Sequence, residues 1–204
     1  MDVHRLAPRL WRWTAYHEEW RQDVGCVYLE TEDATVLIDP LVPAGEPERF
    51  LDYLDADVER AGKPVHILLT VYWHVRSSSE LAKRYRAEVW APKRSALPVE
   101  RRIHKAPTAI RPGDALPGNV EAHESGRASE LVYVLPAQRA LVAGDVLLGG
   151  PLRICPPGWV GKGGQAAVRE ALRPLLDRPL DRVLVSHGEP VLRGGQAALA
   201  SALA

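Results

Sequence analysis

Residues 65–81, VHILLTVYWHVRSSSEL, join a buried strand to a helix through a short loop rich in aromatic and polar side chains. Val65 to Thr70 is a continuous apolar run, which is typical of a strand covered on both faces. Ser78 or Ser79 is expected to cap a helix that runs to about Ala87. The stretch therefore predicts a strand, a loop and a helix in a sheet that helices cover.

The flanking sequence extends this pattern in both directions. Upstream, residues 24–30 and 35–39 predict a hairpin, and residues 47–60 predict a helix that ends before Gly62. Downstream, strands are predicted at 88–91, 131–135, 140–143 and 182–185, and helices at 165–177, where Pro174 is expected to introduce a kink, and at 196–204. The Pro-rich residues 92–118 stay unassigned, and residues 151–164 predict a long loop. Taken alone, this order fits sheets covered by helices without selecting one fold.

Four short segments narrow the choice. They are Val36–Pro40, His66–Thr70 followed by residues 71–76, His123–Gly126 before a hairpin that ends in Ala143-Gly144-Asp145, and Val183–Gly188. In this order they resemble the metallo-β-lactamase superfamily, over about residues 20–190. The resemblance implies an α/β fold, a four-layered αβ/βα sandwich with two mixed sheets face to face and helices outside. It also implies a pocket at one edge, where residues 71–76, 123–126, 145 and 187 converge.

The main metal-binding motif of that family, His-x-His-x-Asp-His, is replaced here. Its four ligand positions hold Val71, Trp73, Val75 and Arg76. Val and Trp offer no ligand atom, and Arg has only hydrogen-bond donors. The resemblance leaves His123 and His187 for one metal ion each and Asp145 between them. A catalytic zinc needs about three protein ligands, so a dinuclear centre is not expected and no cofactor is the first expectation.

One rescue would keep a single metal ion. His74 lies inside the altered motif. With His123, Asp145 and His187 it would give three imidazoles and one carboxylate, enough for one zinc or iron. Against this, side chains alternate faces along an extended segment, so residue 74 is expected to point away from the side that residues 71 and 73 share.

A second rescue would be electrostatic. Because Arg76 replaces a ligand, its guanidinium is expected to fill the space of the missing cation and to form an ion pair with Asp145. Trp73 and Arg76 are the candidates for binding a substrate or an anion, although pocket filling explains Trp73 better than stacking does. Asp39, at a strand end, is expected to be structural.

Composition limits the classes of protein. The chain has 204 residues, with 26 Lys and Arg against 26 Asp and Glu, so its net charge of zero argues against a nucleic-acid binder. The length predicts one domain, residues 1–204. No apolar run is long enough to span a membrane, and the two distant cysteines predict a reducing, cytoplasmic setting. A small-molecule ligand is the expected partner, and the oligomeric state stays open.

Three functions follow from these residues. The first is an altered or non-catalytic member of the family, a pseudoenzyme, that keeps the pocket for a small molecule or a partner. The second is a single-metal hydrolase of an ester, thioester or lactone, with His123, Asp145 and His187 as catalytic candidates. The third is a metal-free anion site formed by Arg76 and the start of the helix after it. Fold resemblance does not decide among them.

Overall fold

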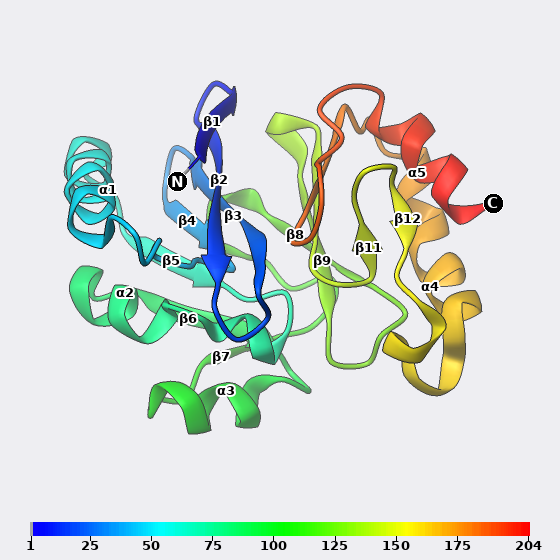
Figure 1. Cartoon of the computed structure of the whole chain (residues 1–204), viewed down its shortest axis with the longest axis horizontal. Coiled ribbons are helices and arrows are strands. Elements are labelled where there is room, and N and C mark those ends of the chain that lie inside the picture. Colours follow the sequence, from blue (N-terminus) through cyan, green and yellow to red (C-terminus); the bar gives the residue numbers. More distant parts are fainter. Residues whose placement is uncertain (1) are drawn as a thin grey trace.

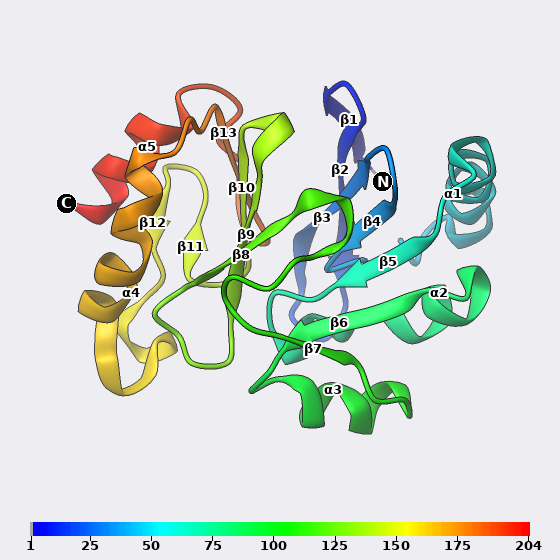
Figure 2. The same cartoon turned by 180° about the vertical axis from the view of Figure 1, so that it is seen from behind.

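Two β-sheets face each other in the computed structural model, which describes residues 2–204, and helices cover both outer sides (Figures 1 and 2). The predicted αβ/βα sandwich is confirmed. None of the helices in residues 2–204 is long and apolar enough to cross a membrane.

The first sheet has seven strands in chain order. They are β1 (Asp2–Ala7), β2 (Leu10–His17), β3 (Gln22–Glu30), β4 (Thr35–Ile38), β5 (Val65–Leu68), β6 (Glu88–Pro92) and β7 (Thr108–Ile110). The first four strands pair antiparallel and the last four parallel. The predicted hairpin of β3 and β4 and the strand β5 are confirmed. The sequence analysis did not predict β1, β2 or β7.

The second sheet has four strands in the order β13-β10-β9-β8, and a short two-stranded sheet lies beside it. The strands are β8 (Glu121–Glu124), β9 (Leu131–Leu135), β10 (Ala140–Ala143) and β13 (Arg182–Val185), with β11 (Leu147–Leu148) and β12 (Arg153–Ile154) in the small sheet. β10 and β13 run parallel, so their carboxyl ends meet at one edge.

Five α-helices form the outer layers. They are α1 (Pro47–Ala61), α2 (Ser78–Tyr85) and α3 (Ala96–Ile103) on the first sheet, and α4 (Gly164–Leu172) and α5 (Gly195–Leu203) on the second. The 3-10 helices are η1 (Tyr72–Val75), η2 (Pro117–Asn119), η3 (Pro136–Gln138), η4 (Pro157–Trp159), η5 (Gly161–Gly163) and η6 (Arg173–Asp177). The helix predicted at 165–177 is therefore α4 and then η6, which begins beside Pro174. The cap predicted at Ser78 or Ser79 is wrong, because Ser77 precedes α2 and its Oγ accepts a hydrogen bond from the Val42 N–H instead.

Apolar side chains fill three layers between these elements. β4 illustrates the arrangement: Val36 and Ile38 pack between the two sheets, and Leu37 packs towards the helices of the first sheet. This alternation follows from the two-residue period of a strand, and burial on both faces explains why β4 reads as an apolar run. The sandwich thus holds the carboxyl ends of β4, β5, β10 and β13 together at one edge.

Candidate functional site

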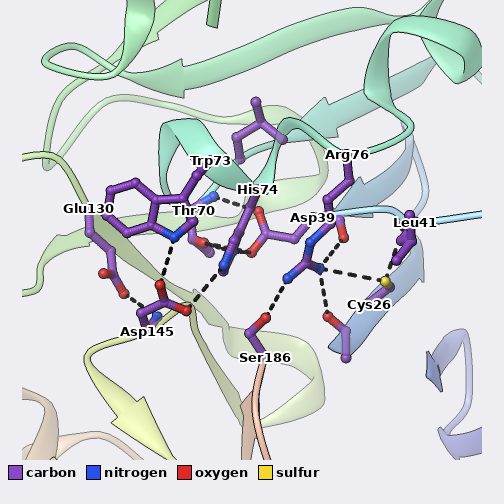
Figure 3. Close-up of polar contacts among 12 residues, drawn as sticks. Cys26, Asp39, Leu41, Thr70, Trp73, His74, Arg76, Glu130, Asp145 and Ser186 are labelled. Atoms are coloured by element: carbon purple, nitrogen blue, oxygen red, sulfur yellow. Dashed lines mark hydrogen bonds and ion pairs between the residues drawn. The ribbon is translucent and has the colours of Figure 1, made fainter. Parts of the chain in front are cut away.

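His74 reaches the site from a single helical turn that follows β5. Residues 72–75 form η1, and the His74 N–H donates to the Val71 carbonyl at 3.1 Å. The expectation of an extended, alternating segment is therefore wrong. Because the chain turns here, the side chains of Trp73 and His74 both approach Asp145 (Figure 3).

Asp39, at the carboxyl end of β4, fixes the orientation of that histidine. Its Oδ1 accepts the Thr70 N–H at 2.8 Å, and its Oδ2 accepts the Thr70 hydroxyl at 2.6 Å. The same Oδ2 lies 2.8 Å from His74 Nδ1. A carboxylate on Nδ1 favours a proton on that nitrogen and leaves the Nε2 lone pair free to bind elsewhere.

Asp145, just after β10, stands at the centre of the site. Its Oδ1 lies 3.1 Å from His74 Nε2 and 3.1 Å from His187 Nε2. Its Oδ2 accepts the Trp73 indole N–H at 2.7 Å. Glu130 holds the backbone at Asp145, because its Oε1 accepts hydrogen bonds from the N–H groups of Asp145 and Val146 at 2.8 and 3.0 Å. Both carboxylate oxygens of Asp145 are thus positioned by neighbours.

The charged groups of the site shift one another's pKa values. Burial alone would raise the pKa of Asp145, but His74 and His187 outweigh it and lower that pKa well below its ordinary value. Burial and Arg76 lower the pKa of His74, whereas Asp39 and Asp145 raise it, and the net direction is upward. Burial, reinforced by Asp145, raises the pKa of Glu130 to about 7. The site therefore favours an ionised Asp145 beside a cation.

One metal ion fits the residues that are present. Ligand atoms of His74, Asp145 and His187 all lie within 4.8 Å of one another, and this is the one such group in residues 2–204. His74 Nε2 and Asp145 Oδ1 are buried, and despite their 3.1 Å separation neither has a hydrogen bond of good geometry. Buried ligand atoms that lie this close together without a hydrogen-bond partner suit a metal ion. Two imidazoles and one carboxylate are also ligands that zinc and Fe(II) accept.

His123 lies outside this group, contrary to the sequence prediction. It is on β8, its Nε2 is 3.2 Å from Glu121 Oε2, and its cross-strand neighbour Val132 packs towards α4 and α5. The adjacent Ala122 takes the face between the sheets. Because neighbouring strand residues face opposite sides, His123 points to the helix layer and not to Asp145.

Arg127 comes from the loop after β8 to the place where the prediction put His123. Its Nη1 lies 3.4 Å from Glu130 Oε2 and 3.9 Å from Asp145 Oδ2. Its guanidinium carbon lies 4.5 Å from the centre of the Trp73 ring. Neither Arg127 nor Glu130 was predicted from the sequence as a site residue. The one available signal was a charged residue, Arg127, directly after the segment His123–Gly126 that carried the family resemblance.

The predicted Arg76–Asp145 ion pair is wrong. In residues 2–204, the Nη1 of Arg76 donates to the carbonyls of Asp39 at 2.8 Å and Gly25 at 3.2 Å, and its Nη2 donates to Ser186 Oγ at 2.6 Å (Figure 3). Arg76 thus ties β3 to the ends of β4 and β13, below the site. These bonds leave the predicted anion site at Arg76 without support.

A cavity of about 640 Å³ opens onto this group. It is lined by Trp20, Gln22, Tyr72, Trp73, Arg102, Arg127, Asp145, Gly158, Trp159 and His187. His187 and Asp145 face it, whereas His74 is fully buried behind them. A hollow of similar volume, about 620 Å³, lies around Arg9, Arg139 and Asp181 and contains no histidine. Trp73, which was predicted to bind a substrate or an anion, lines this cavity. Trp20, Arg102 and Trp159 also line it and were not predicted from the sequence.

Comparison with solved structures identifies the fold. A metallo-β-lactamase from Pontibacter korlensis shares 18% identity, with 99% of this chain and 98% of that chain covered and a TM-score of 0.68. A metallo-β-lactamase from Erythrobacter litoralis shares 16% identity, with 98% and 93% covered and a TM-score of 0.72. The metallo-β-lactamase IND-7 shares 14% identity, with 99% and 97% covered and a TM-score of 0.70. No family model and no curated protein sequence matches the chain.

Proposed function

We propose that this chain, which has the metallo-β-lactamase fold, binds one zinc or iron ion and hydrolyses a small ester, thioester or lactone. The observation that carries the proposal is the convergence of His74, Asp145 and His187, whose ligand atoms lie within 4.8 Å of one another beside a cavity. The predicted metal-free anion site lacks such an observation, because Arg76 is bonded to Asp39, Gly25 and Ser186.

Each residue of the group has a separate task in this proposal. Asp39 holds the Nδ1 side of His74, so that Nε2 faces Asp145 and His187. Trp73 binds the oxygen of Asp145 that faces away from the two histidines. When bound, a divalent metal polarises a carbonyl group and makes water a nucleophile at neutral pH. His187 and Asp145 are the two ligands that a substrate in the cavity would meet.

Hydrolysis assays with a matched histidine control test this function. We expect the purified protein to hydrolyse at least one ester, thioester or lactone of a small panel, to lose this activity to a chelator and to regain it with zinc or Fe(II). His187→Ala is expected to be inactive, because it removes a ligand. His123→Ala is expected to stay active, because His123 lies on the opposite face of its sheet. Activity that survives both the chelator and His187→Ala would contradict the proposal.

A second candidate function, a metal-free binding protein, is favoured by one contact set. His74 lies between two carboxylates, with Nδ1 2.8 Å from Asp39 and Nε2 3.1 Å from Asp145. A doubly protonated imidazole would satisfy both and could replace the metal ion. The cavity would then bind a small molecule without cleaving it. Zinc that fails to bind while a ligand still raises the melting temperature would support this candidate.

A further inference from the structure

The walls of the cavity are unusually aromatic. Three of the chain's six tryptophans, together with Tyr72, line it. Trp20, from the turn between β2 and β3, and Trp159, from η4, approach His187 with ring centres 5.9 and 6.5 Å from the His187 ring. Tyr72 and Trp73 meet edge to face at 4.6 Å. Flat rings on several sides favour a ligand with a flat, apolar body.

The charged groups that line the cavity differ in how free they are to bind a ligand. Asp145 accepts the Trp73 N–H and lies 3.1 Å from each of the two histidines, and Arg127 faces Glu130 and Asp145. Arg102, on α3, is exposed, and within residues 2–204 it forms no ion pair with a carboxylate. Its one protein hydrogen bond is to the Pro98 carbonyl at 3.2 Å. Most of its guanidinium donors are therefore free to meet a ligand.

Arg102 also contacts the aromatic wall of the cavity. Its guanidinium carbon lies 5.2 Å from the centre of the Tyr72 ring. Tyr72 contacts Trp73, and Trp73 contacts Asp145. These contacts run from an arginine at the rim to the candidate metal ligands. A guanidinium that lies over a ring keeps its N–H donors, which can form two parallel hydrogen bonds to a carboxylate or phosphate.

We propose that the cavity takes an organic anion with a flat apolar body, whose anionic end is bound by Arg102 at the rim. The identity of the reacting end rests on the proposed hydrolase. In that hydrolase, the end of the substrate opposite the anion would lie against His187 and Asp145. The class of substrate is thus an ester, thioester or lactone that carries a separate carboxylate or phosphate beyond a planar apolar group.

Binding of matched probes tests this inference separately from hydrolysis. The probes are 2-naphthoate, 2-naphthyl phosphate and the neutral 2-naphthamide, measured by ligand-observed NMR titration at low salt, on the protein as purified and after treatment with a chelator. We expect both anions to bind more tightly than the amide. Arg102→Gln is expected to weaken binding of the anions about fivefold and to leave the amide unchanged, because an exposed ion pair contributes modestly.

Two variants serve as controls. Arg101→Gln removes the same charge from the neighbouring, exposed position of α3, which does not line the cavity, and is expected to change nothing. Trp159→Ala is expected to weaken all three probes equally, because it removes only aromatic wall. Equal effects of Arg102→Gln and Arg101→Gln, or no preference for the anions, would overturn the inference. Binding that follows Arg102 in a protein that takes up no metal would overturn the proposed hydrolase and leave the inference standing.

Discussion

Trp73 has two contacts with charged groups of the site. Its indole N–H donates to Asp145 Oδ2 at 2.7 Å, and its ring lies under the guanidinium of Arg127. We expect Trp73→Phe to keep the ring and lose the hydrogen bond, and so to weaken zinc binding about 10- to 100-fold, which is the usual effect of removing a partner that orients a metal ligand. Competition with a chromophoric chelator measures this affinity.

Trp159→Phe is the matched control for that variant. Trp159 lines the same cavity but has no hydrogen bond to a candidate ligand in residues 2–204. Its zinc affinity is expected to equal that of the unaltered protein. If Trp73→Phe binds zinc as tightly as Trp159→Phe, the indole does not position Asp145.

For individual residues, the sequence predicted part of the candidate site. Asp145 and His187 follow strands that end at one edge, and the prediction placed both there. The candidate metal set of four residues included His123, which the structure does not bring to the other three. The difference is one step along a strand, since Ala122 and His123 face opposite sides. Arg127 and Glu130 come from a loop whose path depends on packing against α4, as the close approach of Gly126 to Ala167 illustrates.

Among the elements, the turn that carries the site depends most on its surroundings. Residues 71–75 are β-branched or aromatic apart from His74, which is typical of a strand. Residues 72–75 form η1 nevertheless, because Thr70 is bound twice by Asp39 and the chain must turn before α2. Tertiary contacts override local preference here, so the strand-like expectation for residue 74 was wrong.

The turn after β10 leaves no room for a side chain at Gly144. A Cβ at this position would lie 2.5 Å from Thr70 Oγ1 and 2.8 Å from Glu130 Oε1. Gly144→Ala is therefore expected to lower the free energy of unfolding by about 1–3 kcal/mol, as other overpacked sites do. Gly45→Ala has no atom within 4 Å of the added Cβ and should be close to neutral. Urea denaturation compares the two variants, and equal stabilities would contradict the packing described.

A buried carboxylate links β3 to α1 and gives a pH dependence. Glu30 has a side chain only 8% exposed, and Arg60 Nη2 lies 2.9 Å from its Oε2. Burial raises the pKa of Glu30, but Arg60 and Lys63 outweigh it and lower that pKa below its ordinary value. The stabilisation is therefore present above the ordinary pKa and is lost as pH falls through the lowered one.

The pH dependence of unfolding tests this link. Between about pH 5 and pH 3, the free energy of unfolding of the unaltered protein should fall by about 1 kcal/mol more than that of Glu30→Gln. The difference is modest because solvent screens the exposed partners of Glu30. Glu32→Gln, at an exposed neighbouring position, should follow the unaltered protein. Parallel curves for all three proteins would show that the contact of Glu30 with Arg60 adds no stability.

For the whole molecule, the layer between the two sheets is shared by both halves of the chain. Leu29 and Ile38 from the first sheet pack there with Tyr133 and Val142 from the second. We therefore propose that residues 1–204 unfold as one domain. Tryptophan fluorescence and far-ultraviolet circular dichroism should give one coincident transition in urea. Two separated transitions would mean that the sheets fold independently.

The fold was easier to predict than the site for a physical reason. Strand ends such as Val36–Pro40 and Val183–Gly188 combine apolar runs with turn residues, and these local signals survive in the sequence. The lining of the cavity is assembled from segments that lie far apart in the chain, such as those of Trp20, Arg102 and Trp159. Nothing local to these residues marks them, because their proximity is a property of the packed sandwich.

The metal content of three proteins tests the central claim most directly. The unaltered chain, His187→Ala and His123→Ala would be purified without an affinity tag, offered zinc, dialysed and measured by elemental mass spectrometry. The account predicts about one metal ion per chain in the unaltered protein and in His123→Ala, and none in His187→Ala. No metal in the unaltered protein, or equal metal in His187→Ala, would contradict a site formed by His74, Asp145 and His187.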